Sequence, residues 1–480
     1  MDSGDTAGAV QFEHLEVAMR GAMSDGLHLD LEGKRAAVIG FGRSGQSALR
    51  LLHALGAHVS VADQKPDAEL TGMFTDAGGS PVEVFGDGQY ERALRGSDLA
   101  LISPGVPVAL EALQKAKAGG IPLIGELELA SRYLTGRLIA VTGTNGKSTT
   151  VSLIGDLLRV AGFDAFVGGN LGTPLADAAL ASLQGHRWDL VVAEVSSFQL
   201  ETIETFHPWI SCILNISPDH LDRYPSLKDY AAAKARVFEN QETEDYSILN
   251  ADDPGLVKFP PSSLGKPVWF SRKGAVKAGV YVQAGTIISN LGKTPEEVVR
   301  ITDLQLRGVH NLENVLAATA VAVLAGCPVH TIQRTLRQFR GLEHVMEVVR
   351  VLRDVTYIND SKGTNVDATI KALESLSSPV ILIAGGREKG EEYPGLAEAV
   401  RGKVKRAILI GEARGRFREI FKGATAVSEA DSLRDAVRQA AALAVAGDTV
   451  LLSPVCASFD MFRDYKDRGA QFKEQVHELA

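Results

Sequence analysis

The chain has 480 residues, 45% of them hydrophobic and 23% charged, which is enough for about three globular domains of ordinary size. Its 50 basic and 59 acidic side chains give a net charge of −9, which argues against a general nucleic-acid or anionic-membrane partner. The three cysteines are widely spaced, which favours a protein without disulfides or a cysteine zinc site. The sequence has no apolar run long enough to cross a bilayer and no signal-peptide pattern, so we expect a cytoplasmic protein that does not insert into a membrane.

Residues 1–33 mix acidic residues, glycine and methionine with weak helical periodicity, which predicts an N-terminal extension that can lack fixed structure. Residues 34–135 form the first predicted domain, with an apolar strand at Ala36–Ile39, the turn GFGRSG, a helix and a second strand ending at Asp63. An acidic residue about 20 positions after the glycines suits a ribose or base, so this unit favours a nucleotide or UDP-sugar site. GxGxxG alone is a weak signal, and an NAD-dependent dehydrogenase is the alternative. A later loop, Ser103–Gly105, follows another strand and could contact phosphate.

The second predicted domain, residues 136–340, opens with a phosphate-loop pattern, VTGTNGKSTT. An apolar strand precedes Gly143 and Gly146, and a helical pattern follows at once, so a helix N-terminus with its free N–H groups would face an anion. Lys147 would reach terminal phosphates, and the hydroxyls of the two residues after it could contact Mg²⁺. Valine occupies the place of the usual first glycine, and an ordinary strand–turn–helix junction with a solvated lysine is the alternative.

Three further features of this domain carry polar groups to predicted strand or helix ends. Glu194 ends a buried strand beside the phosphate loop, the usual place for a Mg²⁺ ligand. His220 follows the next strand, and Lys234 lies on the helix after it. Taken alone, the two are an ordinary loop histidine and a solvated helix lysine. Asn311 and Asn314 share one face at the start of an apolar helix.

The third predicted domain, residues 341–480, alternates strands with helical patterns, which predicts an open parallel sheet. Ligands of such sheets lie at the carboxyl ends of the strands, where the loops NDSKGTN, GGREKG, GEARGR and SPVCASFD follow. The predicted strands are Val355–Ile358, Val380–Ile383, Ala407–Ile410 and Val450–Leu452.

Together with the loop GTNGKST, the stretches GGNLGTP, EVSSFQLE, NDSKGTN and SPVCASFDMFRDYKDRG resemble the Mur ligases, the ATP-dependent amide ligases of peptidoglycan synthesis. The resemblance runs from about Lys34 to the C-terminus, explains the absent glycine and is strongest to the D-glutamate-adding branch. It implies an α/β fold of three domains: an N-terminal Rossmann-like UDP-binding domain, a central P-loop ATPase domain and a C-terminal Rossmann-like open-sheet domain. The last would bind D-glutamate and contribute to ATP binding, in a monomer.

The chemistry that the resemblance implies is amide formation in two steps. ATP phosphorylates the L-alanyl carboxylate of UDP-N-acetylmuramoyl-L-alanine, and the amine of D-glutamate then displaces phosphate from the acyl phosphate. Two anions meet in the first step, so cations are needed, and the resemblance implies two Mg²⁺ ions beside the phosphate-loop lysine.

The resemblance also assigns roles to single residues. The catalytic residues are Lys147, His220 and Lys234. ATP is bound by Gly143, Thr144, Asn145, Gly146, Lys147, Ser148, Thr149, Asn311, Asp360 and Lys362. The UDP-substrate is bound by Arg43, Ser44, Asp63, Ser103, Gly105 and Asn170. D-glutamate is bound by Thr364, Lys389, Ser458, Phe459 and Tyr465, where a phenylalanine is commoner at the last position. The metal ligands are Ser148, Glu194, His220 and Lys234, the last as a carbamate.

One departure concerns the terminal phosphate of ATP. The family usually has His-Arg before the NDSK strand, with the arginine directed at that phosphate, whereas this chain has His344-Val345. The nearest arginines in the sequence that could replace the missing one are Arg387 and Arg350. The departure favours one rival, a paralogue that binds both nucleotides for regulation, but a pure binder needs no second metal. Glu194, His220 and Lys234 therefore favour the ligase.

Overall fold

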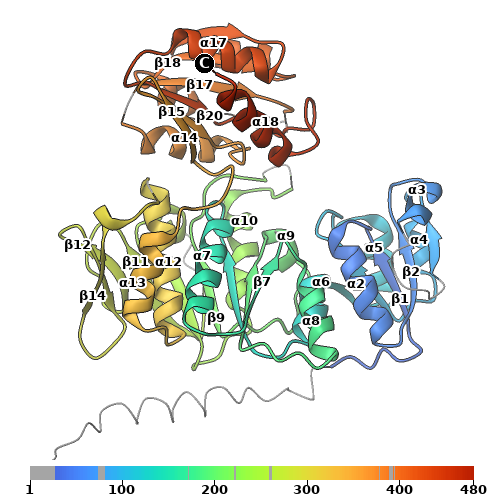
Figure 1. The fold of residues 1–480 in the computed structure, drawn as a ribbon. Helices are drawn as coiled ribbons and strands as arrows, with labels where there is room; N and C mark the ends of the chain where they lie inside the picture. Colours follow the sequence, from blue (N-terminus) through green and yellow to red (C-terminus); the bar gives the residue numbers. More distant parts are fainter. Residues whose placement is uncertain are drawn as a thin grey trace, which may run out of the picture.

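The structure is a computed structural model, and it describes residues 28–73, 82–170, 172–220, 223–258, 262–306, 308–377, 379–388, 393 and 395–479. Within these ranges the strands form three sheets, each covered by helices. Figure 1 shows the three resulting lobes: the N-terminal lobe in blue, the central lobe from green to yellow and the C-terminal lobe in orange and red. This is the three-domain α/β fold predicted. The boundaries near residues 135 and 340 stay predictions.

The N-terminal lobe has an all-parallel sheet of order β3-β2-β1-β4-β5, and its strand order reverses between β1 and β4. The predicted strand–glycine-turn–helix unit is confirmed, because a strand ends at Ile39 and a helix begins at Arg43. The turn between them is tight, since a Cβ at Gly45 would lie 2.2 Å from the carbonyl oxygen of Gly40. The elements are β1 Arg35–Ile39, α2 Arg43–Ala54, β2 His58–Ala62, α3 Asp67–Gly72, β3 Glu83–Phe85, α4 Tyr90–Leu94, β4 Leu99–Ile102, α5 Glu111–Ala118, β5 Leu123–Gly125 and α6 Glu126–Ser131.

The central lobe has a nine-stranded sheet of order β14-β13-β12-β11-β10-β9-β6-β8-β7, with β6, which leads into the phosphate loop, between β8 and β9. The antiparallel strands β12 to β14 at one edge were not predicted. The elements are β6 Arg137–Thr142, α7 Lys147–Val160, β7 Ala165–Gly169, α8 Leu175–Leu183, β8 Leu190–Glu194, α9 Ser197–Leu200, β9 Ile210–Ile213, α10 Leu227–Ala235, η1 Arg236–Phe238, β10 Tyr246–Asn250, α11 Pro254–Lys258, β11 Lys266–Ser271, β12 Gly279–Gln283, β13 Thr286–Asn290, β14 Glu296–Arg300, η2 Ile301–Asp303, α12 Val309–Leu324 and α13 Val329–Gln338.

The C-terminal lobe has a sheet of order β15-β16-β20-β17-β18-β19. The expectation of an open parallel sheet is wrong at one edge, because β15 forms a tight antiparallel hairpin with β16. The elements are β15 Glu347–Leu352, β16 Val355–Asn359, α14 Val366–Ser375, β17 Val380–Gly385, α15 Leu396–Val400, β18 Val404–Ile410, α16 Arg414–Ile420, β19 Ala426–Glu429, α17 Leu433–Leu443, β20 Thr449–Leu452 and α18 Tyr465–His477.

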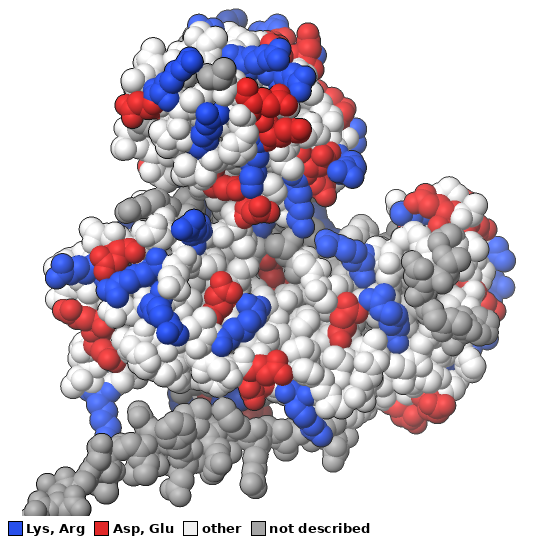
Figure 2. All heavy atoms as spheres, in the orientation of Figure 1, with Lys and Arg blue, Asp and Glu red and all other residues white. Residues whose placement is uncertain are grey.

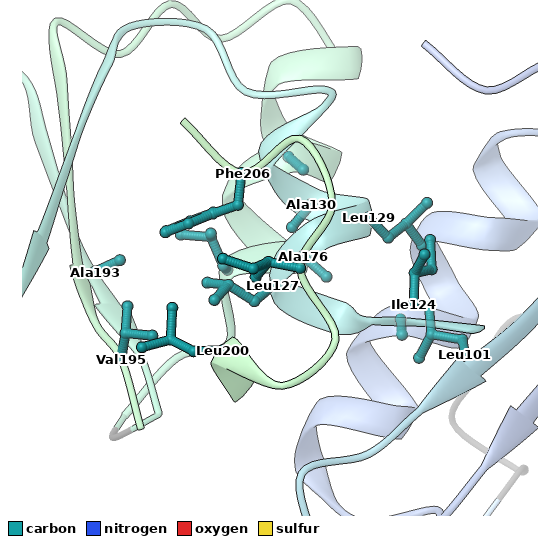
Figure 3. Close-up of a cluster of buried hydrophobic side chains, with 14 of the residues drawn as sticks. Leu101, Ile124, Leu127, Leu129, Ala130, Ala176, Ala193, Val195, Leu200 and Phe206 are labelled. Atoms are coloured by element: carbon teal, nitrogen blue, oxygen red, sulfur yellow. The ribbon is translucent and has the colours of Figure 1, made fainter. Parts of the chain in front are cut away.

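One hydrophobic cluster spans the N-terminal and central lobes, in addition to a cluster within each, whereas the clusters of the C-terminal lobe are separate. Figure 3 shows the shared cluster, in which Leu101 and Ile124 of the first sheet continue through Leu127 on α6 to Ala176 on α8 and Phe206. Apolar packing across this boundary holds the first two lobes together. We infer that relative motion of lobes concentrates at the link to the C-terminal lobe.

The described end of the predicted N-terminal extension packs on the protein. The backbone N–H of Leu29 donates to the hydroxyl of Tyr133 at 3.0 Å, that hydroxyl donates to the Leu29 carbonyl at 2.8 Å, and Leu31 is buried. The rest of the extension, residues 1–27, lies outside the described residues. Among the described helices, none is both long and apolar enough for a bilayer span. Basic and acidic side chains are interspersed on the face in Figure 2.

Candidate active site

The loop after β6 forms a cradle at the N-terminus of α7. Gly143 and Gly146 have φ of 149° and 87°, which side-chain-bearing residues rarely adopt, and a Cβ on Gly146 would lie 2.2 Å from Oδ1 of Asn314. Asn215 fixes the loop, since its Oδ1 accepts from the Asn145 N–H at 2.9 Å and its Nδ2 donates to the Asn145 carbonyl at 3.1 Å. The alternative of an ordinary turn does not explain this construction.

A cavity of about 280 Å³ opens in front of this loop, between the central and C-terminal lobes. Of the predicted ATP-binding residues, all except Gly143 line it, and the Gly143 carbonyl accepts from Nζ of Lys147 at 2.8 Å. The lining residues are Thr144, Asn145, Gly146, Lys147, Ser148, Thr149, Asn170, Glu194, Asn215, His310, Asn311, Asn314, Val345, Met346, Asp360, Lys362, Gly363, Ala368, Lys371 and Ala372.

We call this the ATP cavity, because the predicted ATP-binding residues line it. Polar groups from both lobes meet in it. Ser148 Oγ donates to Oε2 of Glu194 at 2.6 Å, and Nζ of Lys362, from the C-terminal lobe, donates to the same hydroxyl at 2.5 Å. Nδ2 of Asn170 donates to Oε1 of Glu194 at 3.1 Å. Burial lowers the pKa of Lys147, and burial lowers that of Lys362 to about 8. Two desolvated ammonium groups beside a helix N-terminus suit a polyphosphate, whose charge would stabilise both.

Asp360, the predicted ribose contact, is buried at the rim of the cavity. Its Oδ2 accepts from Ser453 Oγ at 2.8 Å and its Oδ1 from the Met346 N–H at 3.2 Å, and burial raises its pKa to about 7. The carboxylate therefore also fixes the segment that joins the two lobes.

Lys234 is buried, with 2% of its surface exposed, so the alternative of a solvated helix lysine is wrong. Its Nζ lies 4.6 Å from the ring centroid of Tyr230. Burial, and then the charge of Lys147, lowers the pKa of Lys234 well below its usual value, while Asp219 and Glu194 oppose the shift. A lowered pKa increases the fraction of the amine that is neutral and nucleophilic.

His220, predicted as the second metal ligand, adopts φ of 55°. Its Nε2 lies 3.7 Å from Oδ2 of Asp219, and its ring centroid lies 4.7 Å from that of Phe198. Neither His220 nor Lys234 is among the residues that line the ATP cavity. The role of both in metal binding stays a prediction.

A second cavity, of about 410 Å³, lies where the strand order of the N-terminal sheet reverses. All six residues predicted to bind the UDP-substrate line it: Arg43, Ser44, Asp63, Ser103, Gly105 and Asn170. Asp63 accepts from the Phe41 N–H at 2.6 Å and the Lys65 N–H at 3.1 Å, so it also shapes the glycine turn. We call this second cavity the UDP cavity, after the predicted residues that line it. Asn170 lines both cavities, so the UDP cavity and the ATP cavity adjoin.

The predicted D-glutamate residues are less well assembled. Thr364, Ser458, Phe459 and Tyr465 do not line either cavity, and Lys389 lies outside the described residues. Tyr465, the first residue of α18, nevertheless lies within electrostatic reach of Glu194 and Arg43. Burial raises the pKa of its phenol, and the charges of Asp464 and Glu194 raise it further while that of Arg43 lowers it. These assignments stay predictions.

Four polar residues that line the ATP cavity were missing from the predicted site. Asn215 follows the end of β9, Asn314 lies three residues after Asn311 on one helix face, and both positions carried a readable signal. His310 and Lys371 carried none, because only the packing of the C-terminal lobe on α12 brings them together.

The donors at Ser148 fit a magnesium ion. Mg²⁺ prefers oxygen ligands and commonly takes one or two from the protein, with substrate phosphates and water completing its shell. The Ser148 hydroxyl and the Glu194 carboxylate, 2.6 Å apart, supply such oxygens at the cavity. No group of three or more His, Cys, Asp or Glu occurs among the described residues, so a cage built from protein side chains alone is not expected there.

Comparison with known proteins covers most of the chain and agrees with this geometry. Three family models match: "Mur ligase MurD-like, N-terminal domain" at residues 34–125, "Mur ligase middle domain" at 141–322 and "Mur ligase, glutamate ligase domain" at 346–456. A curated protein of Koribacter versatilis, named UDP-N-acetylmuramoylalanine--D-glutamate ligase, is 45% identical over 456 residues, covering 94% of this chain and 99% of that protein. The chain belongs to the Mur ligase family. A ligase of the same name from Caldanaerobacter subterraneus is 43% identical over 94% of this chain and its own full length.

Solved structures of Mur ligases share the fold at lower identity. A MurF ligase from Thermotoga maritima, solved in complex with ADP, matches with a TM-score of 0.57 at 14% identity, over 94% of this chain and 97% of that one. The UDP-N-acetylmuramate-alanine ligase of the same organism matches with a TM-score of 0.56 at 18% identity, over 92% and 99%. At such identities the likeness concerns the fold alone.

Proposed function

We propose that this Mur ligase uses ATP to join D-glutamate to UDP-N-acetylmuramoyl-L-alanine in peptidoglycan precursor synthesis, as a cytoplasmic monomer. The observation that carries the proposal is the meeting of two cavities at Asn170, whose side chain donates to Glu194. One cavity is lined by a phosphate loop, the other by the residues predicted to hold a UDP-sugar. The curated relatives that span 94% of the chain bear the name of this activity.

In the first step, an oxygen of the L-alanyl carboxylate attacks the terminal phosphorus of ATP, and the bond to ADP breaks. Lys147 and Lys362 supply positive charge from opposite sides of the cavity, which offsets repulsion between the two anions. Mg²⁺ held by Ser148 and Glu194 would add to this charge compensation and orient the phosphate oxygens. Packing of the C-terminal lobe over the loop would help to exclude water from the acyl phosphate.

In the second step, the amine of D-glutamate attacks the acyl carbon, loses a proton and displaces phosphate to leave the amide. Residues of the C-terminal lobe, among them Ser458 and Tyr465, would hold the amino acid. Tyr465 lies within electrostatic reach of both Glu194 and Arg43, so the C-terminal lobe reaches the junction where the acyl group would lie.

The function is tested by phosphate release from purified protein supplied with ATP and UDP-N-acetylmuramoyl-L-alanine. We expect rapid release with D-glutamate, and a kcat/KM lower by roughly a hundredfold or more with L-glutamate, glycine or meso-diaminopimelate, whose groups would leave the site's polar partners unpaired. Release at the background rate with every amino acid would reject the ligase and favour a nucleotide-binding paralogue.

Val345 lines the ATP cavity at the position where an arginine is usual in the family. The two substitutes suggested by sequence lie elsewhere. Arg350 donates to the carbonyls of Val476, His477 and Leu479, and Arg387 pairs with Glu412 at 3.5 Å. The cavity instead contains Lys362 and Lys371, besides the phosphate-loop lysine.

Val345→Arg is expected to raise kcat by about three- to tenfold with an unchanged KM for the UDP-substrate, because the added cation would act only on the transferring phosphoryl group. Steady-state phosphate release measures both constants, and Val345→Leu provides a control without charge. An unchanged kcat would mean that Lys147, Lys362 and metal already compensate the phosphoryl charge.

A further inference from the structure

Arg223 joins the central lobe to the N-terminal lobe beside the UDP cavity. Its Nη1 donates to the carbonyl of Pro104 at 3.0 Å, across the boundary between the lobes. Its Nη2 pairs with Oε2 of Glu201 at 2.5 Å, and its guanidinium lies 4.1 Å from the ring centroid of Phe198. With its side chain 17% exposed, Arg223 is a largely enclosed arginine with three different contacts.

Contacts of the same residues hold His220. The carbonyl of His220 accepts from the backbone N–H groups of Arg223 and Tyr224, both at 3.0 Å, and Phe198 packs against its ring. The Tyr224 hydroxyl donates to Oε1 of Glu201 at 2.6 Å, so one carboxylate holds both residues. This closed set of contacts supports a left-handed conformation at His220 that a non-glycine residue adopts only when its surroundings impose it.

At its other end, Arg223 holds the loop that forms one wall of the UDP cavity. Ser103, Pro104 and Gly105 line that cavity, and Ser103 Oγ donates to the Gly40 carbonyl at 2.6 Å, which joins the loop to the glycine turn opposite. One guanidinium therefore connects the wall of the substrate cavity with the support of His220.

We propose that Arg223 is a positioning residue that fixes His220 relative to the UDP cavity. A substrate anchored in the N-terminal lobe then has its acyl end correctly placed at the reaction site. This proposal rests on the proposed function. The chemistry requires arginine: its planar group stacks on Phe198 while separate N–H groups reach Glu201 and Pro104. A lysine could keep the charge pair but not all three contacts.

The test compares Arg223→Lys with wild type and with Arg300→Lys, a control at the exposed last residue of β14 in the same lobe. We expect Arg223→Lys to lower kcat about tenfold or more and to raise the Kd for UDP-N-acetylmuramoyl-L-alanine about threefold or more, because misplacement of reacting groups is costly. The KM for ATP and the unfolding temperature should match wild type.

A wild-type kcat and Kd in Arg223→Lys would overturn the proposal. So would equal losses in kcat, ATP affinity and thermal stability, which would indicate a purely structural role. Calorimetric binding of UDP-N-acetylmuramoyl-L-alanine needs no turnover, so it separates the two proposals. If wild type is inactive, the proposed function fails, yet the Kd of Arg223→Lys still decides whether Arg223 holds the cavity wall.

Discussion

Replacing Lys147 with alanine is expected to lower kcat by about 10²–10³-fold, a barrier rise of about 3–4 kcal/mol. Lys147 is the cation of the phosphate loop, and its Nζ donates to the carbonyls of Gly143 and Thr144, both at 2.8 Å. Burial lowers its pKa, so in the free protein its charge is poorly solvated. A bound terminal phosphate would complete its shell, and the interaction strengthens as negative charge shifts during transfer.

The same variant should bind UDP-N-acetylmuramoyl-L-alanine with unchanged affinity, because Lys147 is not among the residues lining the UDP cavity. Calorimetry without ATP measures this binding, and phosphate release measures kcat. Lys273→Ala, which removes an exposed lysine of the same lobe, is the control. A Lys147→Ala enzyme that keeps more than about a tenth of the wild-type kcat would contradict the role, since its barrier would have risen by less than ~1.4 kcal/mol.

The phosphate loop could be predicted from sequence because local chemistry determines it. Two glycines with positive φ, an apolar strand before them and a helix directly after them leave few conformations for the segment between. The second cavity was reached from the same kind of evidence, since most of its residues come from the turns that follow β1, β2 and β4, whereas Asn170 follows β7. In both places residues that shape the backbone line the cavity, and the ligand of the second cavity stays a prediction.

Contacts between lobes could not be predicted in this way. Lys362 contacts Ser148 although the two residues are 214 positions apart in the sequence. Lys371 lines the ATP cavity only because α14 packs near α12. The antiparallel β15 was also missed, because its residues alternate poorly: Val348 and Val351 are both 60% exposed, and the strand pairs through a bulge. Such features depend on tertiary packing, which periodicity does not encode.

Lys234 lies between these two cases. Its role was predicted only through the family resemblance, yet the sequence of α10, LKDYAAAKA, also indicates that Lys234 shares a helix face with Tyr230. Tyr230 and Lys234 are four residues apart and share the buried face of the helix, whereas Lys228 is exposed. A lysine on the buried face of a helix is rarely a solvated one.

Lys234 is proposed to act as a carbamate, formed when its neutral amine attacks CO₂ and loses a proton. The lowered pKa favours the neutral amine that this step requires. The product is a carboxylate, which would attract the nearby ammonium of Lys147, whereas the protonated amine repels it. One addition would thus turn an unfavourable pair of buried cations into a favourable pair and supply an oxygen ligand for metal.

Lys234→Ala is therefore expected to lower kcat by roughly a hundredfold or more, because the site loses a fixed negative group beside the reacting phosphate and its metal. Millimolar acetate or propionate should restore part of the activity by entering the space left by the side chain, and ¹³C-bicarbonate should label wild type but not the variant. Lys228→Ala, on the exposed face of the same helix, should retain wild-type kcat and show no response to acetate.

A folded Lys234→Ala that neither responds to carboxylic acids nor differs from wild type in labelling would leave the lysine a buried structural amine. The charge balance at Lys147 would then have to come from Glu194 and Asp219, the two carboxylates whose charges oppose the lowering of its pKa by burial.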